Sequence, residues 1–160
     1  MLELPHTPGC LVCGPANPHG LHLSLHVDPE TGIVRTIFTP LPQHIGFEGL
    51  VHGGVLATVV DEAMVWAATW AGKRFCVCGE MSIRFRAGAQ VGQQVEVTAQ
   101  VQSSRRGLIE TICEIRTGDM LVATATGKYV PVSPQRNREV IATFVNESAT
   151  EKAAAILRNT

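Results

Sequence analysis

Hydrophobic and polar residues alternate along several segments of the chain, the pattern of strands that bury one face. The most regular alternation runs from Val91 to Ser103, and a second example runs from Leu21 to Asp28. The same pattern predicts further strands at residues 33–38, 75–87, 108–116 and 120–130. Short turns between the last four predicted strands favour an antiparallel meander.

Residues 53–71 follow a different pattern, with apolar side chains around most of the circumference of a predicted helix. Such a helix is expected to be buried rather than to lie on a surface. Gly72 is predicted to end it. Two strands, a buried helix and four more strands predict an α+β domain in which an antiparallel sheet wraps around a central helix.

The ends of the chain have a different composition from its centre. Residues 1–20 are dense in Pro and Gly and are predicted to form an N-terminal loop segment. The main domain is predicted over residues 21–134, and residues 135–160 are predicted to form a C-terminal helical appendage. Ser148 and Glu151 have the spacing of a capping box in front of the last helix.

The composition suits one globular domain. The chain has 160 residues, 45% of them hydrophobic and 17% charged, enough for a core without disulfide staples. Charges at Asp61, Glu62 and Lys73 interrupt the longest apolar stretch, which falls short of the roughly 18 residues that a membrane span needs. The first residues do not resemble a secretory signal. With five cysteines, an odd number, we expect reduced thiols, a cytoplasmic protein and no membrane partner.

The net charge of −1 argues against a dedicated nucleic-acid binder, but the charge is unevenly distributed. Residues 1–62 hold one basic and six acidic side chains, whereas residues 73–106 hold six basic and two acidic ones. This basic zone suggests a small phosphorylated ligand, while solvated arginines on a sheet face are the alternative.

The residues that point to chemistry lie at the start of the predicted helix and inside it. The Gly53-Gly54 pair after His52 leaves backbone N–H groups open beside the positive end of the helix dipole, which suits an oxyanion. Asp61 and Glu62 are carboxylates on a core helix, which is costly unless they are paired or used. The alternative is that one of them points to solvent or pairs with an arginine of the sheet.

Gly53 and Asp61 are eight residues apart, roughly 12 Å along a helix axis. A hydrolytic centre needs its base and its oxyanion donor each about 3 Å from the reacting group. Either the two residues serve separate events, or two copies of the chain meet antiparallel and each supplies one part. We infer a composite site and therefore a dimer.

Three segments resemble the hotdog-fold acyl-CoA thioesterase superfamily, in the branch that contains the phenylacetate-pathway enzyme. Residues 52–63 are similar to its helix motif, and residues 79–85 are similar to the strand that follows this helix. Residues 10–21 are similar to a lead-in segment of some members, and the order of elements matches over residues 21–131.

The resemblance implies a hotdog fold and hydrolysis of a small or medium acyl-CoA thioester at a dimer interface, in a dimer or a dimer of dimers. Asp61 would be the general base or the nucleophile, and the N–H of Gly53 from the partner chain would polarise the carbonyl. His52 would shape the turn or be a packed loop histidine. Members often have Asn or Gln at the position of Gly46, so Gln43 or His44 would substitute for it.

The remaining predicted substrate contacts lie in the same turn and in the basic zone. Cys78 takes a position where the family often has a hydroxyl residue, and arginine side chains suit the phosphates of coenzyme A. The full predicted set is Gly54, His44, Gln43, Cys78, Gly79, Arg84, Arg86, Arg105 and Arg106.

Two other hypotheses stay open at this stage. A non-catalytic protein would hold acyl-CoA or another small ligand in the same pocket, with Asp61 in a structural role. A zinc-dependent interaction module would use Cys10 and Cys13 with His19 and His22. Because His22 falls in a predicted strand and one cysteine pair stands alone, we expect no metal and no cofactor.

Overall fold

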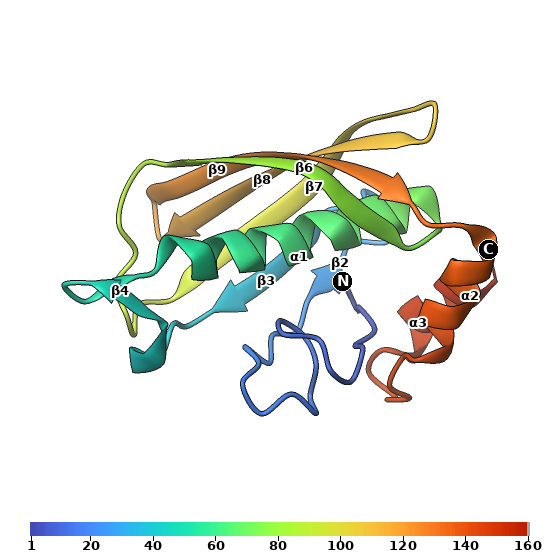
Figure 1. Cartoon of the computed structure of the whole chain (residues 1–160), viewed down its shortest axis with the longest axis horizontal. Coiled ribbons are helices and arrows are strands. Elements are labelled where there is room, and N and C mark those ends of the chain that lie inside the picture. Colours follow the sequence, from blue (N-terminus) through green and yellow to red (C-terminus); the bar gives the residue numbers. More distant parts are fainter. Residues whose placement is uncertain (160) are drawn as a thin grey trace.

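The computed structural model describes residues 1–159 as an antiparallel sheet curved around one long helix (Figure 1). The strands are β1 (Leu2–Glu3), β2 (His26–Val27), β3 (Val34–Phe38), β4 (Ile45–Phe47), β5 (Leu50–Val51), β6 (Cys76–Phe85), β7 (Val95–Arg105), β8 (Leu108–Thr117) and β9 (Met120–Pro131). The helices are a short 3-10 turn (Pro42–His44), α1 (Gly53–Gly72), α2 (Pro134–Ala142) and α3 (Glu151–Arg158).

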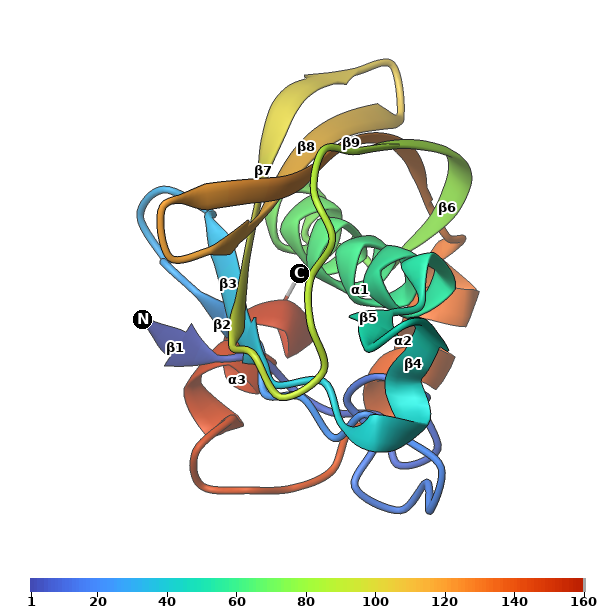
Figure 2. The same ribbon diagram turned by 90° about the vertical axis from the view of Figure 1, so that its left-hand side faces the viewer.

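Helix α1 lies at the centre of the molecule, as the sequence predicts. Seen along the helix in Figure 2, the sheet arches over α1 while the C-terminal helices and the N-terminal loop lie on its other side. Ten side chains of α1 are buried, and they cover most of its circumference: Leu56, Val59, Val60, Ala63, Met64, Trp66, Ala67, Ala68, Thr69 and Trp70. The α+β arrangement is confirmed, with the sheet packed against a helix that is apolar on nearly every side.

The order of strands in the large sheet is β1-β2-β3-β7-β8-β9-β6. The predicted meander is therefore correct for β7, β8 and β9 and wrong for β6, which pairs with β9 rather than with β7. The connection over residues 86–94 is long enough to cross from one side of the sheet to the other, so neighbours in sequence are not neighbours in the sheet. As a result, β6 forms an edge of the sheet.

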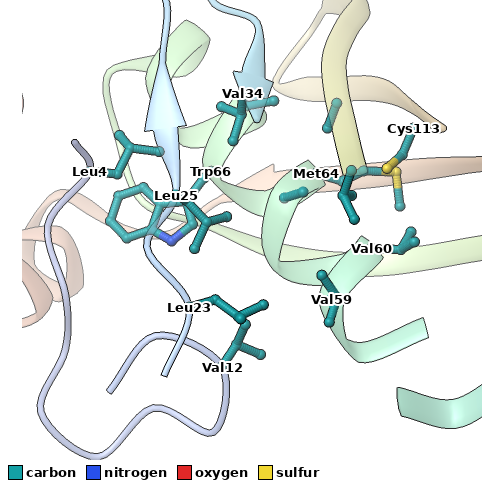
Figure 3. Packing of buried hydrophobic residues seen from close by; sticks show 14 of the residues in the cluster. Leu4, Val12, Leu23, Leu25, Val34, Val59, Val60, Met64, Trp66 and Cys113 are labelled. Atoms are coloured by element: carbon teal, nitrogen blue, oxygen red, sulfur yellow. The ribbon is translucent and has the colours of Figure 1, made fainter. Parts of the chain in front are cut away.

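The predicted strand at 21–28 is mostly wrong, because only His26 and Val27 pair as a strand. Upstream of them the backbone binds the N-terminal loop instead, with the N–H of Leu23 donating to the carbonyl of Val12 at 2.8 Å. The alternation still decides burial: Leu23 and Leu25 pack into the core near Trp66 (Figure 3).

Residues after β9 form α2 and α3, which lie together at one end of the molecule (Figure 1). Phe144, between them, packs on Trp66 of α1 with 6.1 Å between ring centroids. The predicted capping box is wrong, since α3 begins at Glu151 with Thr150, and not Ser148, in the N-cap position and with no side-chain cap hydrogen bond. Within residues 1–159, no helix is both long and apolar enough to cross a bilayer.

Candidate active site

The N-terminus of α1 presents one free backbone donor. His52 is the N-cap residue, and its Nδ1 accepts a hydrogen bond from the N–H of Gly54 at 2.9 Å. The carbonyl of His52 accepts from the N–H of Val55. Within the described residues 1–159, the N–H of Gly53 has no hydrogen-bond partner. Of the two predicted glycine donors, only Gly53 is therefore left to bind a ligand.

Local packing explains why glycines occupy this turn. A Cβ at Gly54 would lie 2.9 Å from Nδ1 of His52 and would disturb the cap. A Cβ at Gly46 would lie 2.9 Å from Cα of His52, so a longer amide side chain does not fit there. A Cβ at Gly53 would meet only the ring of Phe85, at 3.3 Å. The turn thus needs small residues to bring His52 onto the helix end.

Asp61 is half-buried in the middle of α1, and its carboxylate has one strong partner. The hydroxyl of Tyr129 on β9 donates to Oδ1 of Asp61 at 2.7 Å. Tyr129 is fully buried, and burial together with this carboxylate raises its pKa far above the usual value. The phenol therefore stays protonated and holds Oδ1 as an acceptor.

Cys78 of β6 lies beside this carboxylate. Burial and the charge of Asp61 raise the pKa of the Cys78 thiol, so this side chain is a neutral neighbour of the carboxylate. The register of β6 on β9 shifts between Cys78 and Glu80, which leaves Gly79 as an extra residue in a β-bulge. Such bulges often lie next to active sites, where they interrupt the ladder and bend the strand.

One chain does not bring Gly53 and Asp61 together. Both lie on the same helix, eight residues apart, so their separation along the axis is roughly 12 Å. Gly53 lies next to Phe85 at the C-terminal end of β6, whereas Asp61 lies next to Cys78 near its N-terminal end. One chain thus contains both the N–H of Gly53 and the carboxylate of Asp61, but it holds them too far apart to form one site.

Gln43 and His44 form part of a different hollow. They line a pocket of about 400 Å³ together with residues of the N-terminal loop and with Val55 and Thr58 of α1. Nδ1 of His44 accepts from the N–H of Leu41 at 2.9 Å, and burial lowers the pKa of His44. The ring is therefore engaged in holding its own turn, and Asp61 is not among the residues that line this pocket.

The four predicted arginines are exposed and fall into two pairs. Arg84 and Arg86 lie at the end of β6 that is close to Gly53, and strand alternation points them away from the face where Phe85 meets α1. Arg105 and Arg106 lie at the β7–β8 turn, at the other end of the sheet.

Glu62, next to Asp61, points into a different part of the molecule. Its Oε1 accepts from the indole N–H of Trp66 at 3.0 Å, and its carboxylate lies beside Cys10. Burial, and then the neighbouring Cys10, raise the pKa of Glu62 to about 7. The alternative in which Glu62 points to solvent or pairs with an arginine of the sheet is wrong.

Sequence reasoning missed Tyr129 as a partner of Asp61. The signal that was present is that Tyr129 is the one tyrosine of the chain, and it falls at an inward position of a predicted strand. A buried phenol needs a hydrogen-bond partner. The pattern gives no means of choosing that partner, because Asp61 is 68 residues away.

Comparisons with known proteins bear on the fold and on the family resemblance. A family model described as the thioesterase superfamily matches residues 48–124. A search among curated proteins found no significant match. Among solved structures, a thioesterase superfamily protein matches with a TM-score of 0.70 and 27% identity, over 76% of this chain and 62% of that protein's chain.

Two further structures share the fold at lower identity. The PaaI protein from the phenylacetic acid degradation operon of E. coli has a TM-score of 0.65 and 23% identity, over 71% of this chain and 81% of its own. A mutant acyl-CoA hydrolase of Staphylococcus aureus in complex with coenzyme A has a TM-score of 0.64 and 18% identity, over 66% of this chain and 68% of its own. The chain is thus similar to the thioesterase superfamily over residues 48–124, which confirms the resemblance read from the sequence, and its fold is the predicted hotdog fold.

Proposed function

We propose that this protein hydrolyses a small or medium acyl-CoA thioester to the free acid and coenzyme A, at a site shared by two copies of the chain. The observation that supports this most strongly is the free N–H of Gly53 on the same helix as the hydrogen-bonded carboxylate of Asp61. They are too far apart to act on one carbonyl in one chain. A second copy can supply the missing half to each.

The edge strand β6 offers a way to bring the halves together. It is ten residues long and ends the sheet, and a long unpaired edge is a template for pairing with another chain. Two β6 strands that pair antiparallel about their middles would set the Phe85 end of one copy against the Cys78 end of the other. Gly53 lies beside Phe85, and Asp61 lies beside Cys78. Each end of the paired strands would therefore hold the N–H of Gly53 from one copy and the carboxylate of Asp61 from the other.

The chemistry follows from the two groups. The N–H of Gly53 would polarise the thioester carbonyl and stabilise the oxyanion that forms. Asp61, oriented by Tyr129, would remove a proton from water that attacks the carbonyl, or would attack it directly. In the first route the C–S bond breaks, water supplies the hydroxyl of the acid, and the thiolate of coenzyme A takes up the proton. In the second route the C–S bond breaks as Asp61 forms a mixed anhydride with the acyl group, and water then hydrolyses this anhydride to release the acid and restore Asp61.

The remaining predictions complete this proposal. The exposed arginines would bind the phosphates of coenzyme A, with Arg105 and Arg106 at the Asp61 end of the sheet. Gly79, in the bulge beside Cys78, would contact the thioester. The assembly would be a dimer or a dimer of dimers, in the cytoplasm, and the reaction would use no cofactor.

The proposal is tested with a panel of acyl-CoA substrates, with coenzyme A release followed by chromatography. We expect turnover by the wild type and a loss of roughly 10²–10⁴-fold in kcat for Asp61→Asn. Asp119→Asn, which removes an exposed carboxylate at the β8–β9 turn, is the matched control and should keep wild-type turnover. Unchanged turnover of Asp61→Asn would remove Asp61 from the mechanism.

The same panel distinguishes a non-catalytic binder. Such a protein would bind acyl-CoA, measured by calorimetry, without releasing coenzyme A from any member of the panel. That result in the folded wild type would overturn the enzymatic proposal.

A further inference from the structure

Outside the proposed catalytic site, two cysteines of the N-terminal loop meet an acid of α1. The sulfur atoms of Cys10 and Cys13 and a carboxylate oxygen of Glu62 all lie within 4.8 Å of one another. Cys13 is buried, while Cys10 and Glu62 are half-buried. These three residues, which we call the loop–helix cluster, join parts of the chain that are about fifty residues apart.

The loop is folded around the sulfur of Cys10. The N–H groups of Val12 and Cys13 point at this sulfur, at 3.3 and 3.5 Å, and the N–H of Gly14 donates to the carbonyl of Cys10. A Cβ at Gly14 would lie 2.4 Å from the backbone nitrogen of Cys10, so only glycine fits the turn. N–H groups directed at a sulfur favour its thiolate form, which is the form that ligates metals.

The spacing within the cluster fits a tetrahedral ion. Zinc binds thiolate sulfur at roughly 2.3 Å and carboxylate oxygen at about 2.0–2.2 Å, so a tetrahedral arrangement separates S and O by about 3.5–3.7 Å. The sulfur of Cys10 lies 3.7 Å from each carboxylate oxygen of Glu62. The ligand-to-ligand edge that zinc requires is therefore already present.

Trp66 also orients the carboxylate of Glu62. The indole N–H of Trp66 donates to Oε1 of Glu62 at 3.0 Å, in the manner of the outer hydrogen bonds that orient metal ligands. Oε2 lies 3.7 Å from the sulfur of Cys10. His19 and His22 are exposed and lie outside the cluster, so the four-ligand set considered from the sequence alone is wrong for the described residues.

We propose that Cys10, Cys13 and Glu62 bind one zinc ion, with the fourth position open to water or to an added ligand. Two thiolates and one carboxylate favour zinc over magnesium or calcium, which prefer oxygen ligands alone. The ion would fasten the N-terminal loop to α1 at the residue that follows Asp61. The loop also supplies one wall of the pocket that contains Gln43 and His44, so zinc would fix the shape of this wall.

The test uses tag-free protein treated with a chelator and titrated with zinc against a chromophoric competitor. We expect one zinc per chain in the wild type and an affinity at least tenfold lower in Cys10→Ser and in Glu62→Gln. Substitution by cobalt should give a sulfur-to-metal charge-transfer band in the wild type that is lost in Cys10→Ser. Cys78→Ser is the matched control, since it removes an exposed cysteine outside the cluster, and it should bind zinc as the wild type does.

Glu62→Gln keeps the inference testable if the cysteine variant does not fold, because it preserves the shape of the side chain. Circular dichroism checks the fold of each variant. Less than one zinc per ten chains in the folded wild type would overturn the proposal. So would zinc binding that Cys10→Ser and Glu62→Gln leave unchanged, or that Cys78→Ser weakens equally. The outcome does not depend on thioesterase activity.

Discussion

The hydrogen bond between Tyr129 and Asp61 is the polar contact that orients the acid of the proposed site in each chain. The carboxylate lies on a helix whose buried side chains are almost all apolar, so it needs a partner inside the protein. Tyr129 supplies that partner from a fully buried position. The hydroxyl engages Oδ1 only, and the thiol of Cys78 lies beside the same carboxylate, so both roles proposed for the acid would fall to Oδ2.

Tyr129→Phe should lower kcat by roughly 10–100-fold with little change in KM, because a hydrogen bond to a charged group is lost. Turnover of a substrate from the panel measures the effect. Thr111→Val is the control: it removes another buried hydroxyl of the sheet, bonded to the carbonyl of Gly127 and not to Asp61, and should leave kcat unchanged. Equal kcat in Tyr129→Phe and wild type would contradict a positioning role for Tyr129.

The cysteines should differ strongly in reactivity. Burial raises the pKa of Cys76 to about 11 and that of Cys113 to about 12, so at pH 8 their thiolate fractions are on the order of 10⁻³ and 10⁻⁴. Cys78 is exposed. A pulse of iodoacetamide at pH 8, read by peptide mass spectrometry, should modify Cys78 well before these two, and unfolding in urea should abolish the difference. Rapid labelling of Cys113 in the folded protein would contradict this burial.

Gly53 and Asp61 could be predicted from the sequence because each is unusual for its place in a helix. Gly53 belongs to a glycine pair at the start of the helix, and Asp61 is an acid among apolar residues. It did not reach the contacts that orient them. Whether Tyr129 meets Asp61 depends on the pairing of β9 with β6 and on the crossing of α1 beneath them, and residue types alone do not specify such tertiary geometry. Glu62 and Cys10 escaped prediction as partners for the same reason.

At the scale of elements, period and turn residues predicted α1 closely, since apolar side chains cover so much of its circumference. The same patterns did not predict which strands are neighbours in the sheet, because that depends on tertiary pairing. The edge position of β6 depends on the path of the connection over residues 86–94, which has no pattern of its own. The segment upstream of β2 pairs with the N-terminal loop, and His22 takes a positive φ of 53° that interrupts a regular strand.

The C-terminal helices are attached to the central layer by a buried amide. Oδ1 of Asn137 on α2 accepts from the backbone N–H of Phe75 at 2.8 Å, just before β6. Asn137→Ala would leave that donor unpaired and should lower the free energy of unfolding by about 1–3 kcal/mol in urea denaturation. Gln135→Ala, at an exposed position of the same helix, should cost far less. Equal effects of the two substitutions would contradict the attachment.

A site shared by two chains requires that two copies of the whole molecule meet along β6. Phe85 is an apolar side chain 50% exposed at this edge, next to the N-terminus of α1. A pairing that covers it would remove apolar surface from water and satisfy the unpaired backbone of the strand. The exposed edge and the separation of the two half-sites thus have one common explanation.

Phe85→Asp should weaken dimer formation at least tenfold, because two new charges would be buried close to the interface. Analytical ultracentrifugation over a range of concentrations measures the dissociation constant. Met120→Asp, at an apolar residue 41% exposed at the β8–β9 turn, is the matched control and should associate as the wild type does. A dimer unaffected by Phe85→Asp would place the interface elsewhere.

The shared site itself is tested by mixing two inactive variants. Asp61→Asn removes the acid, and Gly53→Pro removes the N–H at the first position of a helix, where proline fits. His52 already has the extended conformation, with φ −59° and ψ 131°, that the residue before proline prefers. Gly53→Ala keeps the N–H and controls for the added carbon atoms.

A mixed dimer of the two variants holds one intact site if acid and donor come from different chains, and none if they come from the same chain. Random assembly of an equal mixture, verified by native mass spectrometry, should therefore restore about a quarter of wild-type turnover. We expect recovery near that level if the site is shared between two chains. Mixed dimers that form and stay as inactive as their parents would contradict it.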